Sequence, residues 1–175
     1  GRGEVDQRFR ELCLLLAAHA LATAGLATSP VEAYRLAEDR LLSGAAAECF
    51  RRMLAAQGGD PRVIEDTDML PSTGLVHRVR CDRDGFVEAI DALAIGRAAG
   101  ALGAERQRKG QSIDPAVGIV LHARRGDPVS NGDPLADLHV RREADGEHVA
   151  EAVRAAFVIS PMAPPPRPAI LELIR

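Results

Sequence analysis

The pattern of apolar residues changes abruptly at residues 58–61, where the sequence reads Gly-Gly-Asp-Pro. Before this point apolar residues recur every three or four positions, which is the period of an α-helix. After it, turn residues divide the chain into short apolar runs, a pattern typical of β-strands. The change predicts an α+β fold in which a helical N-terminal part precedes a mixed part.

Three helices are expected before residue 58. The first ends at Gly25, because glycine readily takes the left-handed conformation that closes a helix. The second begins at Ser29-Pro30, where serine caps the helix and proline suits its first position. The third follows Gly44 and ends at Gly58-Gly59. Nothing in these helices covers their apolar faces, so a partner layer is expected. The apolar stripe of the first helix consists of Phe9, Leu12, Cys13, Leu16, Ala17, Ala20, Leu21 and Ala24.

A polar connector at residues 60–74 precedes the β-rich part of the chain. Residues 75–80 are predicted to form a strand, Asp82 to Gly85 a turn, and residues 86–90 the returning strand of a hairpin. The later elements expected are helices at 92–102 and 148–156, strands at 117–122, 136–140, 157–159 and 170–174, and a polyproline II arm at 161–168.

A short repeat lies within the β-rich part. It reads Gly126-Asp127-Pro128-Val129 and then Gly132-Asp133-Pro134-Leu135. Both glycines suit tight turns, and the pattern between two strands is typical of the hairpin in a barrel-sandwich hybrid, the fold of biotinyl and lipoyl carriers. Those carriers are modified on a lysine at a hairpin tip, whereas Lys109, the only lysine, precedes the hairpin. The scaffold is therefore expected without the carrier function.

Composition excludes several classes of function. The 175 residues include 22 basic and 25 acidic side chains, for a net charge of −3, so no basic stripe for nucleic acid is expected. No apolar run reaches the ~18 residues that cross a membrane. The three cysteines form no CxxC pair, which favours a reducing cytoplasm. Because the chain begins with glycine and not methionine, it is expected to be a piece of a longer protein.

No catalytic, cofactor-binding or metal-ligating residue is predicted from the motifs. The acidic residues between 60 and 68 lack the register of a calcium-binding loop, and the five histidines lack zinc-site spacings. His122 and His139 lie on the strands that flank the glycine hairpin and could approach each other. The alternative without a function, two histidines that face water, is more common for such residues. The acids are expected to be a solvated loop.

Several motifs in order resemble one enzyme family. The stretch "AAQGGDPRVIEDTDMLP" and the residues from Val79 to Leu135 closely resemble the C-terminal part of the thymidine and pyrimidine nucleoside phosphorylases. The matching positions include Asp84-Gly85, Ile90-Asp91, Ile95-Gly96, Leu102-Gly103-Ala104, Arg106, Lys109, Ile113-Asp114-Pro115, Val117-Gly118-Ile119 and Gly126-Asp127. The resemblance implies that residues 1–59 are the helical tail of the family's α/β domain, 60–74 a connector, and 75–175 the C-terminal domain.

The resemblance also implies a function. Members of this family are cytoplasmic, dimeric transferases that cleave pyrimidine nucleosides with inorganic phosphate to the base and (deoxy)ribose 1-phosphate. Their phosphate- and base-binding segments lie in N-terminal regions absent from these residues, so no catalytic residue is carried over. The segment is expected to be architectural, inactive alone, without a cofactor, and partnered by the missing helical and α/β domains. Two departures are Glu4, where proline is usual, and Glu105, where glycine is common.

A stand-alone binding module that keeps only the C-terminal scaffold is the alternative. The two hypotheses differ in the burial of the first helix. A self-sufficient module should bury Phe9, Leu12, Leu16 and Leu21, by itself or in a dimer, whereas a fragment should leave them exposed.

Overall fold

The computed structural model describes residues 6–106, 110, 112–168, 170 and 172. The chain divides into two compact units, which are described separately. Unit 1 comprises Gly1–Thr67 and Arg167–Arg175, and unit 2 comprises Asp68–Pro166. The division predicted from the sequence, into a helical tail at 1–59, a connector at 60–74 and a C-terminal domain at 75–175, remains a prediction.

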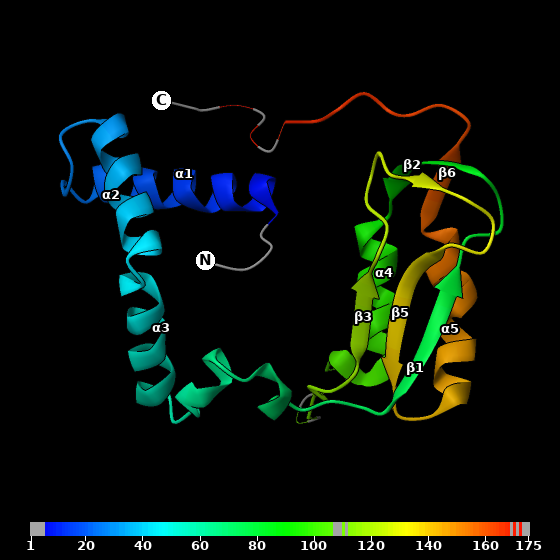
Figure 1. The fold of residues 1–175 in the computed structure, drawn as a ribbon. Helices are drawn as coiled ribbons and strands as arrows, with labels where there is room; N and C mark the ends of the chain where they lie inside the picture. Colours follow the sequence, from blue (N-terminus) through cyan, green and yellow to red (C-terminus); the bar gives the residue numbers. More distant parts are fainter. Residues whose placement is uncertain (1–5, 107–109, 111, 169, 171, 173–175) are drawn as a thin grey trace. The chain divides into compact units, whose positions relative to one another are not determined.

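Unit 1 contains the three expected helices, α1 (Gln7–Thr23), α2 (Pro30–Leu42) and α3 (Ala45–Ala56) (Figure 1). The capping predictions are confirmed. The Ser29 hydroxyl accepts a hydrogen bond from the Glu32 amide at 3.2 Å. At the end of α1, Gly25 has φ +70° and the Leu26 amide donates to the Leu21 carbonyl at 3.0 Å. This 6→1 bond is the mark of a Schellman motif, so the glycine stops the helix as the sequence predicts.

Helix α1 packs against α2 through small side chains. Leu14 and Ala18 of α1 are buried, as are Ala33 and Ala37 of α2. Most of the predicted apolar stripe lies away from α2: Phe9 and Leu16 are each 62% exposed, whereas Leu12 and Leu21 are half-buried. Helix α1 is therefore apolar on two faces, and α2 covers only one of them. Two short 3₁₀ turns, η1 (Pro61–Ile64) and η2 (Thr67–Met69), follow α3.

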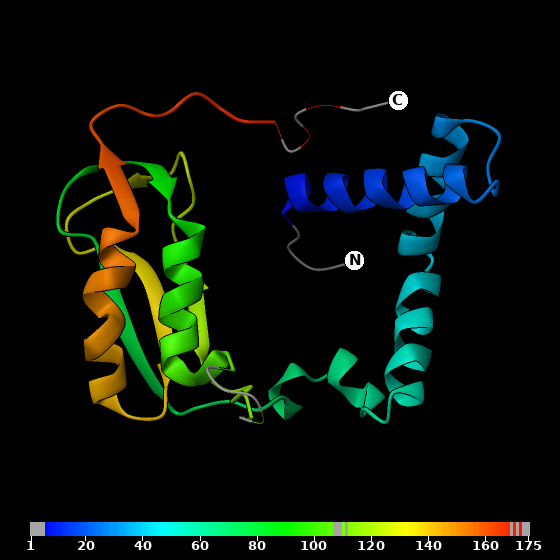
Figure 2. The same cartoon turned by 180° about the vertical axis from the view of Figure 1, so that it is seen from behind.

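Unit 2 contains two antiparallel three-stranded sheets. One has the order β1 (Leu75–Arg80), β5 (Pro134–Val140), β3 (Gly118–Leu121). The other has the order β4 (Pro128–Val129), β2 (Gly85–Ile90), β6 (Phe157–Ser160). Helices α4 (Ala92–Ala99) and α5 (Glu143–Ala155) both lie on one face of the β1–β5–β3 sheet, as the two opposite views show (Figures 1 and 2). The α+β class is confirmed.

The core of unit 2 lies between this sheet and the two helices. Its largest fully buried side chains are aliphatic and come from three strands, β1, β2 and β5, and from α5. They are Leu135, Leu138, Val79, Val87, Val140 and Val153.

The predicted hairpin of residues 75–90 is wrong. Strand β1 pairs with β5, and β2 pairs with β4 and β6, so the two strands belong to different sheets. Instead of bonding each other, the backbone groups on either side of the turn at residues 82–85 form hydrogen bonds with the Gly-Asp repeat. Cys81 exchanges two hydrogen bonds of 2.8 Å with Gly132 and Asp133, and Val87 exchanges bonds of 2.8 and 3.0 Å with Gly126 and Asp127.

The two copies of the repeat have the same local geometry. Gly126 has φ +99° and Gly132 has φ +92°. In each copy the aspartate carboxylate accepts a backbone amide three residues earlier, at 2.8 Å for Asp127 and 2.7 Å for Asp133. The prediction that this repeat builds the hairpin between β3 and β5 is confirmed, since those strands are neighbours.

Glu105 causes no strain in the loop after α4. The helix continues into a π-helical turn at Gly100–Ala104, and the positive φ of that turn, +110°, is at Gly103. Glu105 itself is extended, with φ −131° and ψ 151°. A Cβ on Gly100 would lie 2.5 Å from the Glu105 carboxylate, so the glutamate occupies the space that this glycine leaves.

The remaining predictions concern the end of the chain. The predicted strand at 170–174 falls mostly outside the described residues, and the described Ile170 and Glu172 are not in a strand. Residues 161–168 carry no helix or strand, as expected for the proline-rich arm.

Candidate functional site

An ion cluster lies on the face of the β1–β5–β3 sheet that α4 and α5 leave uncovered. Asp137 of the central strand is only 9% exposed. Arg78 of β1 donates to its two oxygens at 2.7 and 2.8 Å, and His122 Nε2 lies 3.0 Å from Oδ2. These hydrogen bonds, that of Arg78 above all, hold the pKa of Asp137 well below its usual range, although burial opposes the shift. The cluster therefore links Asp137 of β5 to Arg78 of β1 and to His122, the residue that follows β3, and both carboxylate oxygens accept hydrogen bonds.

The two histidines that could approach each other lie at opposite ends of the β3–β5 pair. His122 contacts Asp137, whereas His139 lies opposite Val76 and Gly118 in the sheet register. No group of three or more His, Cys, Asp or Glu among the described residues is arranged to hold a metal ion.

The acidic segment forms local ion pairs. Asp60 accepts three bonds from the Arg62 side chain, which lower the pKa of Asp60 to about 2. Glu65 pairs with Arg51 of α3. These pairs are exposed, and such pairs contribute little to stability.

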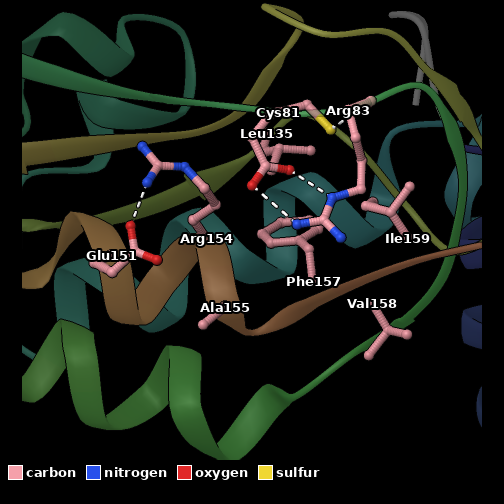
Figure 3. A pocket seen from close by; sticks show the side chains of 10 residues that line it. Cys81, Arg83, Leu135, Glu151, Arg154, Ala155, Phe157, Val158 and Ile159 are labelled. Carbon is pink, nitrogen blue, oxygen red and sulfur yellow. Dashed lines mark hydrogen bonds and ion pairs between the residues drawn. The ribbon is translucent and has the colours of Figure 1, made fainter.

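A pocket of about 370 Å³ opens in unit 2 between the end of α5, strand β6 and the turn after β1 (Figure 3). One part of its wall is apolar and the other is charged. The apolar lining comprises Leu135, Ala155, Phe157, Val158 and Ile159, and the remaining lining comprises Cys81, Asp82, Arg83, Glu151 and Arg154. The volume falls within the usual range for small-molecule sites.

The charged part of the wall consists of two ion pairs. Arg83 donates to both oxygens of Asp82, from Nε at 2.7 Å and Nη2 at 3.0 Å. Arg154 pairs with Glu151 and also donates from Nε to the Arg80 carbonyl at 3.1 Å. Figure 3 shows Arg83 and the Arg154–Glu151 pair at opposite sides of the opening. The four formal charges sum to zero.

Arg83 is the main cause of the lowered pKa of Asp82 in this pocket. Its hydrogen bonds lower the pKa of Asp82, and the more distant charge of Arg154 acts in the same direction. The Cys81 thiol is buried and donates to the Arg83 carbonyl at 3.1 Å.

The motif analysis missed this pocket. Its charged residues belong to a turn and to a helix that are about 70 positions apart in the sequence, and no spacing rule connects them. The segment Asp82 to Gly85 signals a turn in the sequence, and the structure adds that the turn faces α5.

Comparison with known proteins matches part of unit 2 to a known domain family. Residues 86–160, which lie entirely within unit 2, match the family described as "Pyrimidine nucleoside phosphorylase C-terminal domain". The chain is also 40% identical over 142 residues to the pyrimidine-nucleoside phosphorylase of Geobacillus stearothermophilus. That alignment covers 81% of this chain and 33% of the relative, so the chain spans about a third of the relative's length.

The mixed unit is thus a phosphorylase-type C-terminal domain, in which two helices cover one face of an antiparallel sheet. Residues 86–160 match that C-terminal domain family, and the chain as a whole is similar to the C-terminal portion of the relative. None of the helices within the described residues combines the length and the apolar character needed to cross a membrane.

Proposed function

We propose that this chain is the C-terminal segment of a pyrimidine nucleoside phosphorylase and that its role is architectural. The observation that carries the proposal is the 40% identity over 142 residues. Unit 2 spans only residues 68–166, so an alignment of this length must extend into the helices of unit 1. The likeness therefore includes both parts of the chain, as expected for one piece of a longer enzyme.

In this proposal residues 1–59 are the helical tail of the enzyme's α/β domain. Residues 60–74 are a connector, and residues 75–175 form the C-terminal domain. The full enzyme is a cytoplasmic homodimer that transfers a pentosyl group from a pyrimidine nucleoside to inorganic phosphate, its co-substrate. The groups that bind phosphate and base belong to the preceding domains, so this chain alone is inactive.

The uncovered face of α1 is the docking surface for the missing part. Phe9, Cys13, Leu16, Ala17 and Ala20 lie along this face at spacings of three and four, and all are exposed. A second apolar face on a helix normally packs against another element, and α2 covers only the opposite side. Burial of Phe9 and Leu16 would stabilise the assembly by about 1.5–3 kcal/mol each.

Complementation tests the proposal. The purified chain is mixed with the Geobacillus stearothermophilus enzyme truncated to the part that precedes the aligned region. Phosphorolysis of uridine and thymidine is then measured with and without phosphate. We expect no turnover from either piece alone and phosphate-dependent turnover from the mixture. Turnover by this chain alone would refute its architectural role.

The docking surface has its own test. Leu16→Glu places a charge on the exposed face of α1 and should abolish complementation without unfolding unit 1, because Leu16 is 62% exposed. Val31→Glu on α2 is the matched control, since Val31 is an even more exposed apolar residue of the same unit, at 78%. Equal activity of the two variants would contradict docking through α1. No complementation at all, together with a stable dimer that buries Phe9 and Leu16, would favour the stand-alone module.

A further inference from the structure

We propose that the edge of strand β3 in unit 2 is a pairing site for a second copy of this chain. The two β3 strands would pair antiparallel and join their sheets. Strand β3 is the outer strand of the β1–β5–β3 sheet, and none of the described strands lies beyond it (Figure 1). The inference does not depend on the proposed function, because it concerns only the surface of unit 2.

The backbone of β3 has hydrogen-bonding groups that point away from the sheet. The His122 amide, directly after β3, donates to a carbonyl of β5 at 2.9 Å. Bonded residues alternate along an antiparallel ladder, so Gly118 and Val120 also bond to β5. Ile119 and Leu121 therefore direct their N–H and C=O groups outward. Within the described part of the chain, these outward groups have no hydrogen-bond partner.

The other described sheet edges of unit 2 carry features that discourage pairing. Strand β1 carries two arginines at alternate positions, and the carbonyl of one, Arg80, accepts a bond from Arg154. Strand β4 has two residues and begins with proline, and β6 pairs with β2 in an irregular register and is followed by proline. Strand β3 has neither a charge nor a proline, and Val120 and Leu121 are 49% and 38% exposed. An apolar edge of this kind is a template for a further strand.

The sequence of β3 complements itself in one symmetric register. With Val120 opposite Val120 of the second copy, Ile119 is opposite Leu121 of that copy, and all of the outward groups bond to one another. In the same register His122 is opposite Gly118, so its ring meets no side chain there. Residues 116–123 include no Asp, Glu, Lys or Arg, so like charges do not meet along the pair. These matches favour a second copy over an unrelated strand.

Apolar side chains on both faces of the sheet add to the backbone bonds. Val120 is directly opposite Asp137 in the β3–β5 register, so it lies on the face that the helices leave uncovered. Ile119 and Leu121 lie on the other face, where Ile119 packs against the core. Pairing would remove these side chains from water. Because the interface is small, we expect a weak dimer that forms at about 100 μM.

The experiment uses the 175-residue chain with Leu16→Glu in every sample, so that the apolar face of α1 does not drive association. Sedimentation equilibrium measures the monomer–dimer equilibrium, and amide hydrogen exchange is followed at low and at high protein concentration. We expect the Ile119 and Leu121 amides to become protected as the concentration rises. The Gly118 and Val120 amides bond to β5 and should be protected throughout, which makes them internal controls.

Val120→Lys would place two lysines directly opposite each other in the pair and should weaken the dimer about tenfold. Val76→Lys is the matched control and should leave the dimer unchanged. Val76 is a valine of similar exposure, 45%, and lies on the same sheet face, on strand β1 at the opposite edge. The dispersion of the amide spectrum reports whether each variant is folded.

A chain that stays monomeric up to about 1 mM would overturn the inference. Equal dimerisation of the two valine variants would also overturn it, as would a dimer in which the Ile119 and Leu121 amides exchange freely. Protection of these amides only after addition of the truncated Geobacillus stearothermophilus enzyme would assign the edge to the missing part and refute pairing between copies. None of these measurements requires turnover, so a failure here is separate from a failure of complementation.

Discussion

Gly146 in helix α5 lies against strand β1, and a methyl group at this position tests that packing directly. A Cβ built on Gly146 would lie 2.6 Å from the Cβ of His77 and 2.9 Å from its Cγ. Both atoms are close to the backbone of β1, so they cannot rotate away as the tip of a long side chain would. Gly146→Ala therefore requires α5 and β1 to move apart.

Two effects of opposite sign determine the result. Alanine in place of glycine within a helix stabilises it by up to about 1 kcal/mol. Overpacking a closed interface costs about 1–3 kcal/mol, and the rigid contact with His77 places this variant in the upper half of that range. We expect a net loss of about 1–2 kcal/mol, which for a unit of this size lowers the midpoint of thermal unfolding by roughly 5–10 °C.

Gly96 of α4 supplies the matched control. It also lies inside a helix, but a Cβ there would have no neighbour within 4 Å. Gly96→Ala should therefore stabilise the chain by about 0.5–1 kcal/mol. The assay is urea unfolding followed by circular dichroism. Amide hydrogen exchange in β1 and α5 provides the local measurement, because tyrosine fluorescence would report only on Tyr34 of unit 1.

A Gly146→Ala variant as stable as the wild type, or one that shifts in the same direction as Gly96→Ala, would refute this reasoning. A second background makes the cause specific. With His77→Gly the opposing Cβ is absent, so Gly146→Ala should no longer destabilise the unit, and the two substitutions should be strongly non-additive.

Three further predictions follow from the fold. Asp137→Asn should lower the free energy of unfolding by about 1–2 kcal/mol at pH 7. Folding lowers the pKa of Asp137 from 3.8, so its stabilisation is present above pH 3.8 and should disappear as the pH falls further. Urea unfolding at several pH values measures this dependence. Gly126→Ala and Gly132→Ala should each cost about 1 kcal/mol by the same measurement, since both have positive φ and open space for a methyl group, and a much larger effect at one would contradict their equivalence. A thiol reagent should label Cys13 and Cys49 in the native chain and reach Cys81 only after unfolding, and fast labelling of all three thiols would contradict the burial of Cys81.

Local signals in the sequence predicted the elements well. The caps at Ser29 and Gly25 act within four or five residues of the helix ends that they define, so the sequence contains the whole cause. The partners of β1 and β2 depend instead on the Gly-Asp repeat some 40 to 50 residues later. Because a short turn between two strands usually forms a hairpin, the local pattern predicted the wrong pairing.

The sequence pattern could not predict which face of α1 is buried, and it could not predict the pocket. Apolar residues lie on two faces of α1, and packing against the alanines of α2 decides that Leu14 and Ala18 face inward. The pocket joins a turn, two strands and a helix end, each of which has an ordinary sequence. The position of Arg83 and Arg154 beside apolar residues of the pocket follows from tertiary packing alone.

The two units differ in how far they satisfy their own apolar surfaces. Unit 2 buries large aliphatic side chains from both of its layers, including Leu135, Leu138 and Val153. The buried set of unit 1 is Leu14 with alanines at 18, 33 and 37, while Phe9 and Leu16 remain exposed. Burial of alanine contributes far less than burial of leucine or phenylalanine, because the stabilisation scales with the apolar area removed from water. Unit 2 therefore has the core of an independent domain, whereas unit 1 leaves a large apolar surface of α1 exposed. In the proposed phosphorylase a preceding domain would cover α1, and the helices would then belong to a core that the chain supplies only in part.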